Sequence, residues 1–405
     1  MAVLWLLLLA GLPSFLVVFA WVLIQQFLTA EIPSTLKHLA KMWFIHGIWL
    51  YVLTLGNILE KLRICTMPRF LQFLEGLMPI NKDPNMLVTD LHFGTIPVRL
   101  LKPKKASSQP RRGIIFYHGG GALTGSLDRY HRLCSSMALE TDSVVLMVGY
   151  RRLPDHHHPA IYLDCLNVSI HSLKDLTCGV DPSRVVLCGE SIGGWTVALV
   201  TQTLVSQANL PQMQAQVLIT PIVQVLNFQL PSHLQKRNVP FLTRDLMISL
   251  ICKYLDIDLS WKDVMLTGAC VSLNAWKKYK KWVSSDNIPQ KFRSKSFQPK
   301  LGPFNEAAYL ETKHILDEKI SPLLADDKII AQLPQAFLVS CENDPLCNDT
   351  LLYKKHLEDQ GVPVTWYHVE DGFHGCMVLF DKQPFSFPCS RNILNAIINY
   401  MKSIS

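Results

Sequence analysis

Beyond residue 85 the chain alternates between apolar runs of strand length and stretches with helical periodicity. The apolar runs are nearly unbroken, which is the pattern of strands that are buried on both faces. Such strands, separated by helices, indicate an α/β fold with a mainly parallel central sheet covered by helices. The predicted strands lie at 86–101 (two short strands), 112–118, 142–150, 183–190, 215–222, 335–343 and 364–371. The predicted helices lie at 159–176, 194–208, 349–360 and 389–403.

Residues 224–320 interrupt this alternation. The segment is rich in tryptophan and lysine, mostly helical in pattern, and too long for an unstructured loop within a compact domain. We interpret it, together with residues 31–85, as a helical cap over one end of the sheet. The predicted organisation is an N-terminal segment at 1–30, the first part of the cap at 31–85, and an α/β domain at 86–405 that carries the cap insertion at about 224–320.

The N-terminal segment is strongly apolar, and its first charged residue is Glu31. An apolar run of this length can span a hydrocarbon core of about 30 Å as a helix. A cleavable signal peptide is the alternative, but it would have a basic start and a shorter apolar centre. We therefore predict an uncleaved membrane anchor at 1–30. Lys37 and Lys41 follow it, and they leave its orientation open.

A second apolar stretch covers residues 42–62 and is interrupted by His46, Gly47 and Asn57. Two interpretations are open, a second membrane span and a buried or membrane-apposed helix. The uninterrupted apolar part is short for a span, which favours the second interpretation.

The composition agrees with membrane contact, because 49% of the residues are hydrophobic and 18% are charged. The net charge of +7 comes mainly from basic residues at 102–112 and 276–282. We interpret both stretches as solvated loop and helix faces, because no stacking motif or recognition fold for nucleic acid accompanies them. Attraction to anionic lipid is the second interpretation. No nucleic-acid partner is predicted.

The eleven cysteines are too dilute for a disulfide scaffold, and their odd number leaves at least one thiol free or paired between chains. No CxxC pair occurs, so zinc-ribbon and thioredoxin interpretations have no support. The histidine run DHHHP at 155–159 lacks acidic or cysteine partners at ligand spacing. We predict a turn there, and we predict no metal and no cofactor.

The strand at 183–190 ends in GESIG, a GxSxG motif at 189–193 that stands between a strand and a helix. In this context the motif makes a sharp turn, which needs flanking glycines and raises the Ser191 hydroxyl to the carboxyl edge of the sheet. The five residues alone are a weak signal, because many strand–turn–helix connections contain Gly and Ser. Their position in the chain carries the prediction that Ser191 is a nucleophile.

A serine nucleophile needs a base and an orienting carboxylate, which follow it in this fold in the order Ser, Asp or Glu, His. Asp344 comes just after one predicted strand, and His374 follows the next in a loop bracketed by glycines. We predict that Asp344 orients His374 and that His374 activates Ser191. The competing carboxylates are Glu342, Asp349 and Asp371.

Three consecutive glycines, Gly119, Gly120 and Gly121, follow the strand at 112–118. Acyl transfer builds negative charge on the carbonyl oxygen, and losing one preorganised N–H donor to it costs about 3–4 kcal/mol. We predict that the donors are the backbone amides of Gly119 and Gly120, joined by that of Ile192. A plain glycine-rich turn or a phosphate loop is the alternative, but no Lys-Ser/Thr follows and a GxGxxG fingerprint is absent.

With these motifs in place, the sequence resembles the hormone-sensitive-lipase branch of the α/β-hydrolases, and within it the arylacetamide deacetylase-like family. The resemblance covers essentially the whole chain, including the N-terminal anchor. It rests on HGGG (118–121), YRRLPDHHHPA (150–160), GESIGG (189–194), DPLCND (344–349) and DGFHG (371–375).

The resemblance implies an α/β-hydrolase fold with the nucleophile on Ser191, the acid on Asp344, the base on His374 and the oxyanion motif on His118–Gly120. It also implies a cap built from the N-terminal segment and the insertion. Finally, it implies a single-pass type II anchor in the endoplasmic-reticulum membrane, with the catalytic domain in the lumen.

The sequence departs from the family pattern at three positions near these motifs. Glu190 and Ile192 stand where relatives commonly have Asp and Ala, and the bulkier Ile192 is expected to narrow the acyl site. Leu123 stands where arylacetamide deacetylase has the cysteine that would pair with the position of Cys341. The resemblance therefore implies that the family's disulfide is absent here.

The predicted function is a membrane-anchored serine hydrolase that cleaves carboxylic esters through an acyl-enzyme, with arylacetamides and neutral lipid esters as further candidates. The alternative is a non-catalytic member that binds a lipophilic ligand under its cap, as plant gibberellin receptors of this branch do. Loss of a member of the Ser–Asp–His set would favour that alternative, and all three are present. The sequence names neither the physiological ester or amide nor a protein partner.

Two N-x-S/T acceptors, Asn167 and Asn348, lie in the α/β domain. Short sequons arise by chance about as readily as by function. Together with the anchor and the resemblance, they lead us to expect a lumenal domain that is glycosylated on at least one of the two.

Overall fold

The computed structural model describes residues 2–31, 33–80, 82–174, 179–293 and 300–404. In these ranges eight strands form one sheet in the order β1-β2-β4-β3-β5-β6-β7-β8. The pairs β1–β2 and β2–β4 are antiparallel, and the remaining pairs are parallel, so the sheet is mainly parallel. The strands are β1 (Met86–Phe93), β2 (Ile96–Pro103), β3 (Arg111–Tyr117), β4 (Val144–Val148), β5 (Val180–Glu190), β6 (Ala215–Ile219), β7 (Gln335–Asn343) and β8 (Val364–Phe373).

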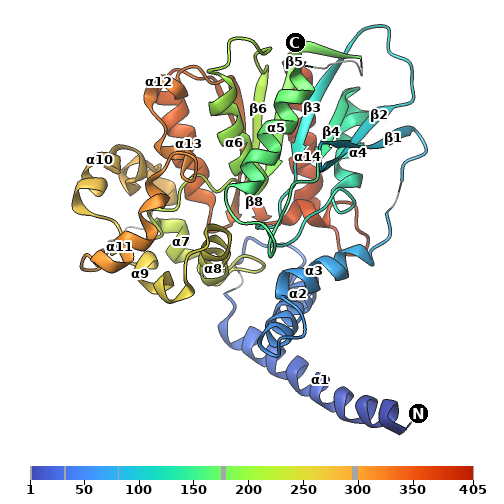
Figure 1. Ribbon diagram of the computed structural model, residues 1–405, viewed down its shortest axis with the longest axis vertical. Coiled ribbons are helices and arrows are strands. Elements are labelled where there is room, and N and C mark those ends of the chain that lie inside the picture. Colours follow the sequence, from blue (N-terminus) through green and yellow to red (C-terminus); the bar gives the residue numbers. More distant parts are fainter. Residues whose placement is uncertain (1, 32, 81, 175–178, 294–299, 405) are drawn as a thin grey trace.

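Helices cover both faces of this sheet (Figure 1). Successive side chains of a strand point to opposite faces, and every residue of β3 is buried. Ile115 and Tyr117 belong to the apolar cluster that includes α5 (Ala160–Lys174) and α6 (Ile192–Leu204). Ile114 and Phe116 belong to the cluster that includes α4 (His131–Thr141) and α14 (Pro388–Ser403). The two-sided cover explains the unbroken apolar runs. The helices of this domain are α4 (His131–Thr141), α5 (Ala160–Lys174), α6 (Ile192–Leu204), α13 (Cys347–Asp359) and α14 (Pro388–Ser403).

The segment between β6 and β7 is helical and lies to one side of the sheet (Figure 1). Its helix α10 (Leu273–Val283) carries the basic stretch at 276–282. Ala275, Tyr279 and Val283 are buried at a spacing of four, and the lysines between them are exposed, so this stretch is the solvated face of an amphipathic helix. The helices of the insertion are α7 (Pro231–Gln235), α8 (Arg244–Leu255), α9 (Lys262–Leu266), α10 (Leu273–Val283), α11 (Glu306–Thr312) and α12 (Asp327–Ile330).

The two ends of this insertion are bonded to each other. The Leu323 N–H donates to the carbonyl of Val223 at 2.9 Å. The Val225 N–H donates to the hydroxyl of Ser321 at 3.2 Å. The chain therefore leaves and re-enters the domain through one closed stem.

The other basic stretch, at 102–112, is not solvated throughout, and our interpretation is wrong for its last two residues. Arg111 and Arg112 are buried at the start of β3. Arg111 Nε donates to Asp142 at 2.8 Å, and Arg112 Nη2 donates to the carbonyl of Ile404 at 2.5 Å. Both guanidinium groups therefore anchor the central strand to its neighbours.

The N-terminal helices α1 (Ala2–Thr29), α2 (Leu39–Lys61) and α3 (Met67–Gly76) gather at one end of the molecule, and α1 projects away from the domain (Figure 1). Phe15 and Phe19 of α1 pack edge-on against Tyr51 of α2, with ring centroids 4.9 and 5.5 Å apart. Among the described residues, α2 is the one helix long and apolar enough to cross a membrane, and 28% of its apolar window is buried. The apolar helical stretch Pro13–Gln25 of α1 is shorter.

Candidate active site

The turn between β5 and α6 is a single residue, Ser191, with φ of 56° and ψ of −117°. L-residues rarely adopt this conformation. Glycines on either side permit it, because a Cβ on Gly189 would lie 2.3 Å from the carbonyl oxygen of Gly193, and a Cβ on Gly193 would lie 2.1 Å from that of Tyr117. The Ser191 N–H donates to the carbonyl of Ile219 at 2.8 Å. The serine is thereby held at the carboxyl edge of the sheet.

The loops after β7 and β8 bring a carboxylate and an imidazole to this serine. His374 Nε2 lies 2.9 Å from Ser191 Oγ, and His374 Nδ1 lies 2.9 Å from Asp344 Oδ2. The Asp344 side chain is fully buried, and its other oxygen accepts the Leu346 N–H at 2.8 Å. When Nδ1 donates its proton to the carboxylate, Nε2 is free to accept one from the hydroxyl. The three side chains thus form one hydrogen-bonded chain.

The competing carboxylates have other partners. Glu342 accepts from Lys236 Nζ at 2.7 Å and faces His368 Nε2 at 3.2 Å. Asp349 is buried beside His233, with Oδ2 2.7 Å from Nε2, and Asp371 pairs with Lys37 at 3.2 Å. Among the predicted carboxylates, Asp344 is therefore the one that the structure places against His374.

Two acidic groups set the protonation of the imidazole. Burial lowers the pKa of His374, but the Asp344 charge and hydrogen bond and the Glu190 charge together raise this pKa above its ordinary value. Glu190 accepts a hydrogen bond from the Tyr130 hydroxyl at 2.6 Å, and burial raises the pKa of its carboxyl. The imidazole is neutral, and able to act as a base, only at pH values above its raised pKa.

The glycine loop after β3 turns sharply beside Ser191. Gly120 has φ of 119°, and a Cβ there would lie 2.2 Å from the carbonyl oxygen of Thr124. The Gly120 carbonyl accepts the N–H groups of Leu123 and Thr124 at 3.1 and 3.0 Å, so the peptide between Gly120 and Gly121 is held in one orientation. Gly120, Ser191 and Ile192 all line the same cavity. The loop is thus placed where backbone donors to an oxyanion are expected.

His118 lies beneath this loop rather than in the cavity, which corrects its place in the oxyanion motif. Its Nδ1 donates to the carbonyl of Gly119 at 2.8 Å, and the Tyr150 hydroxyl donates to the carbonyl of His118 at 2.6 Å. Burial lowers the pKa of His118 to about 3, so the ring is neutral. Gly119 packs against Tyr130, whose hydroxyl would lie 2.7 Å from a Cβ at that position. His118 therefore holds the shape of the loop.

A cavity of about 610 Å³ opens at Ser191. Its walls are mostly apolar and come from α2, α3, α8 and the loop after β8, for example Trp49, Leu74, Leu250 and Leu379. Apolar cavities of this kind with a few convergent polar groups bind small lipophilic ligands. Sequence reasoning did not assign these wall residues, although Ile45, Ile48, Trp49 and Val52 recur at helical spacing within the stretch at 42–62.

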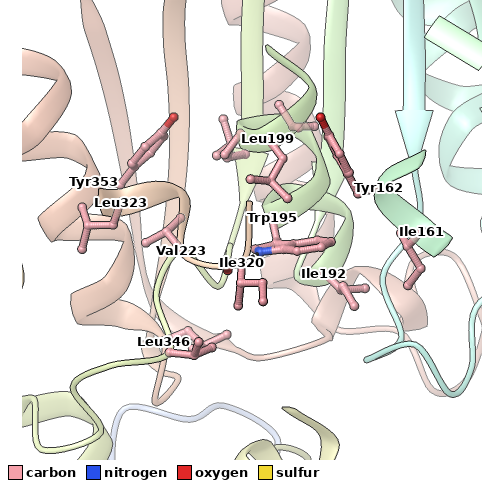
Figure 2. Close-up of a cluster of buried hydrophobic side chains, with 14 of the residues drawn as sticks. Ile161, Tyr162, Ile192, Trp195, Leu199, Val223, Ile320, Leu323, Leu346 and Tyr353 are labelled. Atoms are coloured by element: carbon pink, nitrogen blue, oxygen red, sulfur yellow. Dashed lines mark hydrogen bonds between the residues drawn. The ribbon is translucent and has the colours of Figure 1, made fainter. Parts of the chain in front are cut away.

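Sequence reasoning also missed Trp195, which lies one turn after Ser191. Its indole Nε1 donates to the carbonyl of Ile320 at 2.8 Å, and Gln202 Nε2 donates to that of Pro322 at 3.0 Å. Figure 2 shows the indole nitrogen directed at Ile320, within a cluster of apolar side chains. The run WTVALV gives no local signal for this role. The nucleophile helix α6 is thus bonded to the end of the insertion.

The remaining sequence-based candidates are placed as follows. The histidine run at 155–159 forms a turn before α5, where Asp155 pairs with Arg69 at 2.8 Å. No group of three metal-ligating side chains was found within the described part of the chain. Leu123 lines the cavity, and Cys341 is a buried free thiol that hydrogen-bonds with Cys376.

Comparison with known proteins agrees with this architecture. A family model described as alpha/beta hydrolase fold matches residues 114–281 and 285–378. The solved esterase of Pyrobaculum calidifontis superposes with a TM-score of 0.63 at 21% identity, covering 91% of this chain and all of the esterase. At that identity the likeness supports the fold.

Two curated relatives extend the likeness to the sequence. The chain is 61% identical to human arylacetamide deacetylase-like 4 over the full length of both proteins. It is 32% identical to neutral cholesterol ester hydrolase 1 of Pongo abelii, covering 78% of this chain and 79% of that protein. The chain therefore belongs to the arylacetamide deacetylase-like family of α/β-hydrolases.

Proposed function

We propose that this protein is a membrane-anchored serine hydrolase that cleaves carboxylic esters of lipophilic molecules through an acyl-enzyme. The observation that carries the proposal is the hydrogen-bonded chain from Asp344 through His374 to Ser191, which opens into an apolar cavity of about 610 Å³. A polar chain of this kind at the floor of an apolar cavity suits a substrate with one polar bond in a lipophilic frame. The name of the cholesterol ester hydrolase relative supports the same substrate class.

The proposed mechanism has two halves. In the first, Ser191 Oγ attacks the ester carbonyl while His374 Nε2 accepts the hydroxyl proton, and the alcohol leaves with that proton. In the second, water attacks the acyl-enzyme with His374 again as the base, and the acid is released. Backbone N–H groups of Gly119, Gly120 and Ile192 are the proposed donors to the oxyanion in both halves.

Labelling with a fluorophosphonate tests this proposal directly. After removal of glycans, membranes that contain the protein should show a labelled band close to the chain mass of 45.9 kDa, and Ser191→Ala should remove it. A protein that binds lipophilic ligands without catalysis would retain ligand binding but show no label and no ester turnover. That result would favour the non-catalytic alternative.

We expect Glu190→Gln to extend ester hydrolysis to lower pH. The Glu190 charge favours the protonated form of His374, so its removal lowers the pKa of His374 and keeps the base neutral in more acidic solution. Glutamine retains an oxygen for the Tyr130 hydroxyl. The midpoint of the acid limb of kcat/KM, measured with a soluble ester, should fall to lower pH. A midpoint that stays or rises would contradict the assigned role of this charge.

We further propose that the α/β domain lies in the lumen of the endoplasmic reticulum and carries a glycan on Asn167. Asn167 is exposed on α5. Asn348, by contrast, is 1% exposed, and its Oδ1 accepts the Ser232 N–H at 2.6 Å. A glycan on Asn348 has no room in the folded domain, so the expectation of an acceptor there is withdrawn.

Endoglycosidase H treatment should therefore increase the gel mobility of the expressed protein. Asn167→Gln should abolish this shift, whereas the control Asn274→Gln, on an asparagine that is also exposed but has no sequon, should leave it intact. Absence of a shift, together with digestion of the domain by protease added outside sealed microsomes, would place the domain on the cytosolic side.

A further inference from the structure

The mouth of the cavity is formed by large apolar side chains that are also exposed. Ile48 of α2, Met78 after α3 and Phe385 after β8 line the cavity, yet they are 42%, 44% and 39% exposed. Phe44, one turn before Ile48, is 58% exposed and stacks on Phe385 with centroids 6.3 Å apart. The mouth is thus bordered by side chains that water solvates poorly.

Two further exposed apolar side chains, Phe73 and Leu77, lie close in the chain to the mouth residue Met78. Phe73 and Leu77 are four residues apart, so they share a face of this helix, and they are 63% and 65% exposed. The other face is held firmly, because Gln72 Nε2 donates to the carbonyl of Leu123 at 2.8 Å and Glu75 Oε1 accepts the Gly125 N–H at 2.9 Å. We call the six residues of this surface the apolar rim: Phe44, Ile48, Phe73, Leu77, Met78 and Phe385.

The N-terminal helix α1 packs on α2 close to the rim residue Ile48. Phe15 and Phe19 of α1 pack on Tyr51, which is three residues from Ile48 on α2. α1 has no acidic or basic residue in its first or last turn, and it leaves the molecule at the end where α2 and α3 lie (Figure 1). An α1 inserted in a bilayer therefore holds the rim against the surface of that bilayer.

Basic side chains border the same surface. Lys382 lines the cavity, and Lys41 donates to the carbonyl of Ser386 at 2.8 Å beside the rim residue Phe385. Apolar side chains flanked by lysines match the interface of a bilayer, where the ammonium groups meet lipid phosphates and the apolar groups meet acyl chains. A bilayer supplies both phosphates and acyl chains along the whole rim, and an inserted α1 would keep the bilayer next to the rim.

We propose that the apolar rim is inserted in the bilayer interface and that ester substrates pass from the bilayer directly into the cavity. The proposal rests on the proposed function, because it concerns access to the same site. The rim would act as a continuous apolar path between acyl chains and Ser191. A lipophilic ester then reaches the serine without the cost of transfer through water.

The test uses the full-length chain reconstituted in phosphatidylcholine vesicles and two substrates in the same sample. One is a water-soluble p-nitrophenyl butyrate, and the other is a long-chain methylumbelliferyl ester dissolved in the bilayer. The double change Phe73→Glu and Leu77→Glu places two carboxylates at the interface, so it should lower kcat/KM for the bilayer ester by about tenfold. The value of kcat/KM for the soluble ester should stay within about twofold of that of the unmodified chain. The control is the double change Leu273→Glu and Leu310→Glu, on α10 and α11, because these leucines are comparably exposed at 70% and 56%. It should leave kcat/KM for both esters unchanged.

A second measurement reports contact directly. A polarity-sensitive fluorophore on Leu77→Cys, in a background with Cys65→Ser and Cys178→Ser, should emit at shorter wavelength in vesicles than the same fluorophore free in buffer. A fluorophore on Leu273→Cys in the same background should not show this blue shift. The proposal would be overturned if the double variant lost hydrolysis of both esters in parallel, or if its kcat/KM for the bilayer ester were unchanged. Absence of the blue shift at position 77 would overturn it as well. Failure of the proposed function looks different, because the unmodified chain would then hydrolyse neither ester and take no fluorophosphonate label.

Discussion

Ser191→Ala is expected to lower kcat/KM for a soluble short-chain ester by about a thousandfold or more. Alanine removes the Oγ atom that attacks the carbonyl and leaves the cavity and the glycine loop in place. The residual rate should reflect the oxyanion donors and substrate binding alone. Hydrolysis of a p-nitrophenyl ester by purified protein, with thermal unfolding measured in parallel, checks both the loss and the intact fold.

The matched control is Ser172→Ala on α5. Ser172 is half-buried and donates to the carbonyl of Val168 at 2.7 Å, far along the chain from the nucleophile turn. This change should leave turnover within about twofold, as is usual for substitutions away from special features. Hydrolysis that survives undiminished in Ser191→Ala would refute the assigned nucleophile.

Asp344→Asn is expected to cost up to about 10⁴-fold in kcat, the loss seen when the orienting carboxylate of a serine hydrolase is replaced by an amide. An amide NH₂ facing His374 Nδ1 favours the tautomer with the proton on Nε2, and that tautomer cannot accept the Ser191 proton. Loss of the carboxylate charge also lowers the pKa of His374, since this charge helps to raise it. Steady-state kinetics across pH separates the two effects, because the lost turnover should not return at high pH.

The neighbouring carboxylates serve as controls. Glu342→Gln should change kcat by about threefold or less, because Glu342 faces Lys236 and His368 rather than His374. Asp349→Asn disturbs a buried contact with His233, so we expect a lower unfolding temperature and a much smaller loss of turnover per folded molecule. If either change cost more turnover per folded molecule than Asp344→Asn, the assignment of the acid would be wrong.

The elements that carry the site could be predicted because their signals are local and their geometry is shared. Ser191, Asp344 and His374 each follow an apolar strand, and parallel strands bring their carboxyl ends to one edge. Their contacts at 2.9 Å therefore follow from strand order rather than from any long-range pattern in the sequence. The glycines at 119–121 and 189–193 could be predicted for a local reason too, because a sharp turn at the end of a strand leaves no room for a Cβ.

Features that depend on distant packing could not be predicted. Helix α4 was missed, although Leu133 and Met137 lie four residues apart on its buried face, because the surrounding residues are weakly apolar. Arg111 and Arg112 look like solvated charge until their partners from elsewhere in the chain are known. The sequon of Asn348 can likewise be recognised from three consecutive residues, whereas the burial of Asn348 depends on packing against residues from elsewhere in the chain.

The closed stem of the insertion has a consequence for how specificity diverges among relatives. Because Val223 and Leu323 bond to each other, the chain between them can change length and sequence without separating β6 from β7. Trp195 bonds to the backbone carbonyl of Ile320, close to the stem, so this contact of the nucleophile helix does not depend on which side chain stands at position 320. Natural selection can therefore remodel the part of the cavity wall that α8 supplies, and a chimera joined at these two positions would carry the donor's α8 wall, while the walls from α2 and α3 and the catalytic residues stay unchanged.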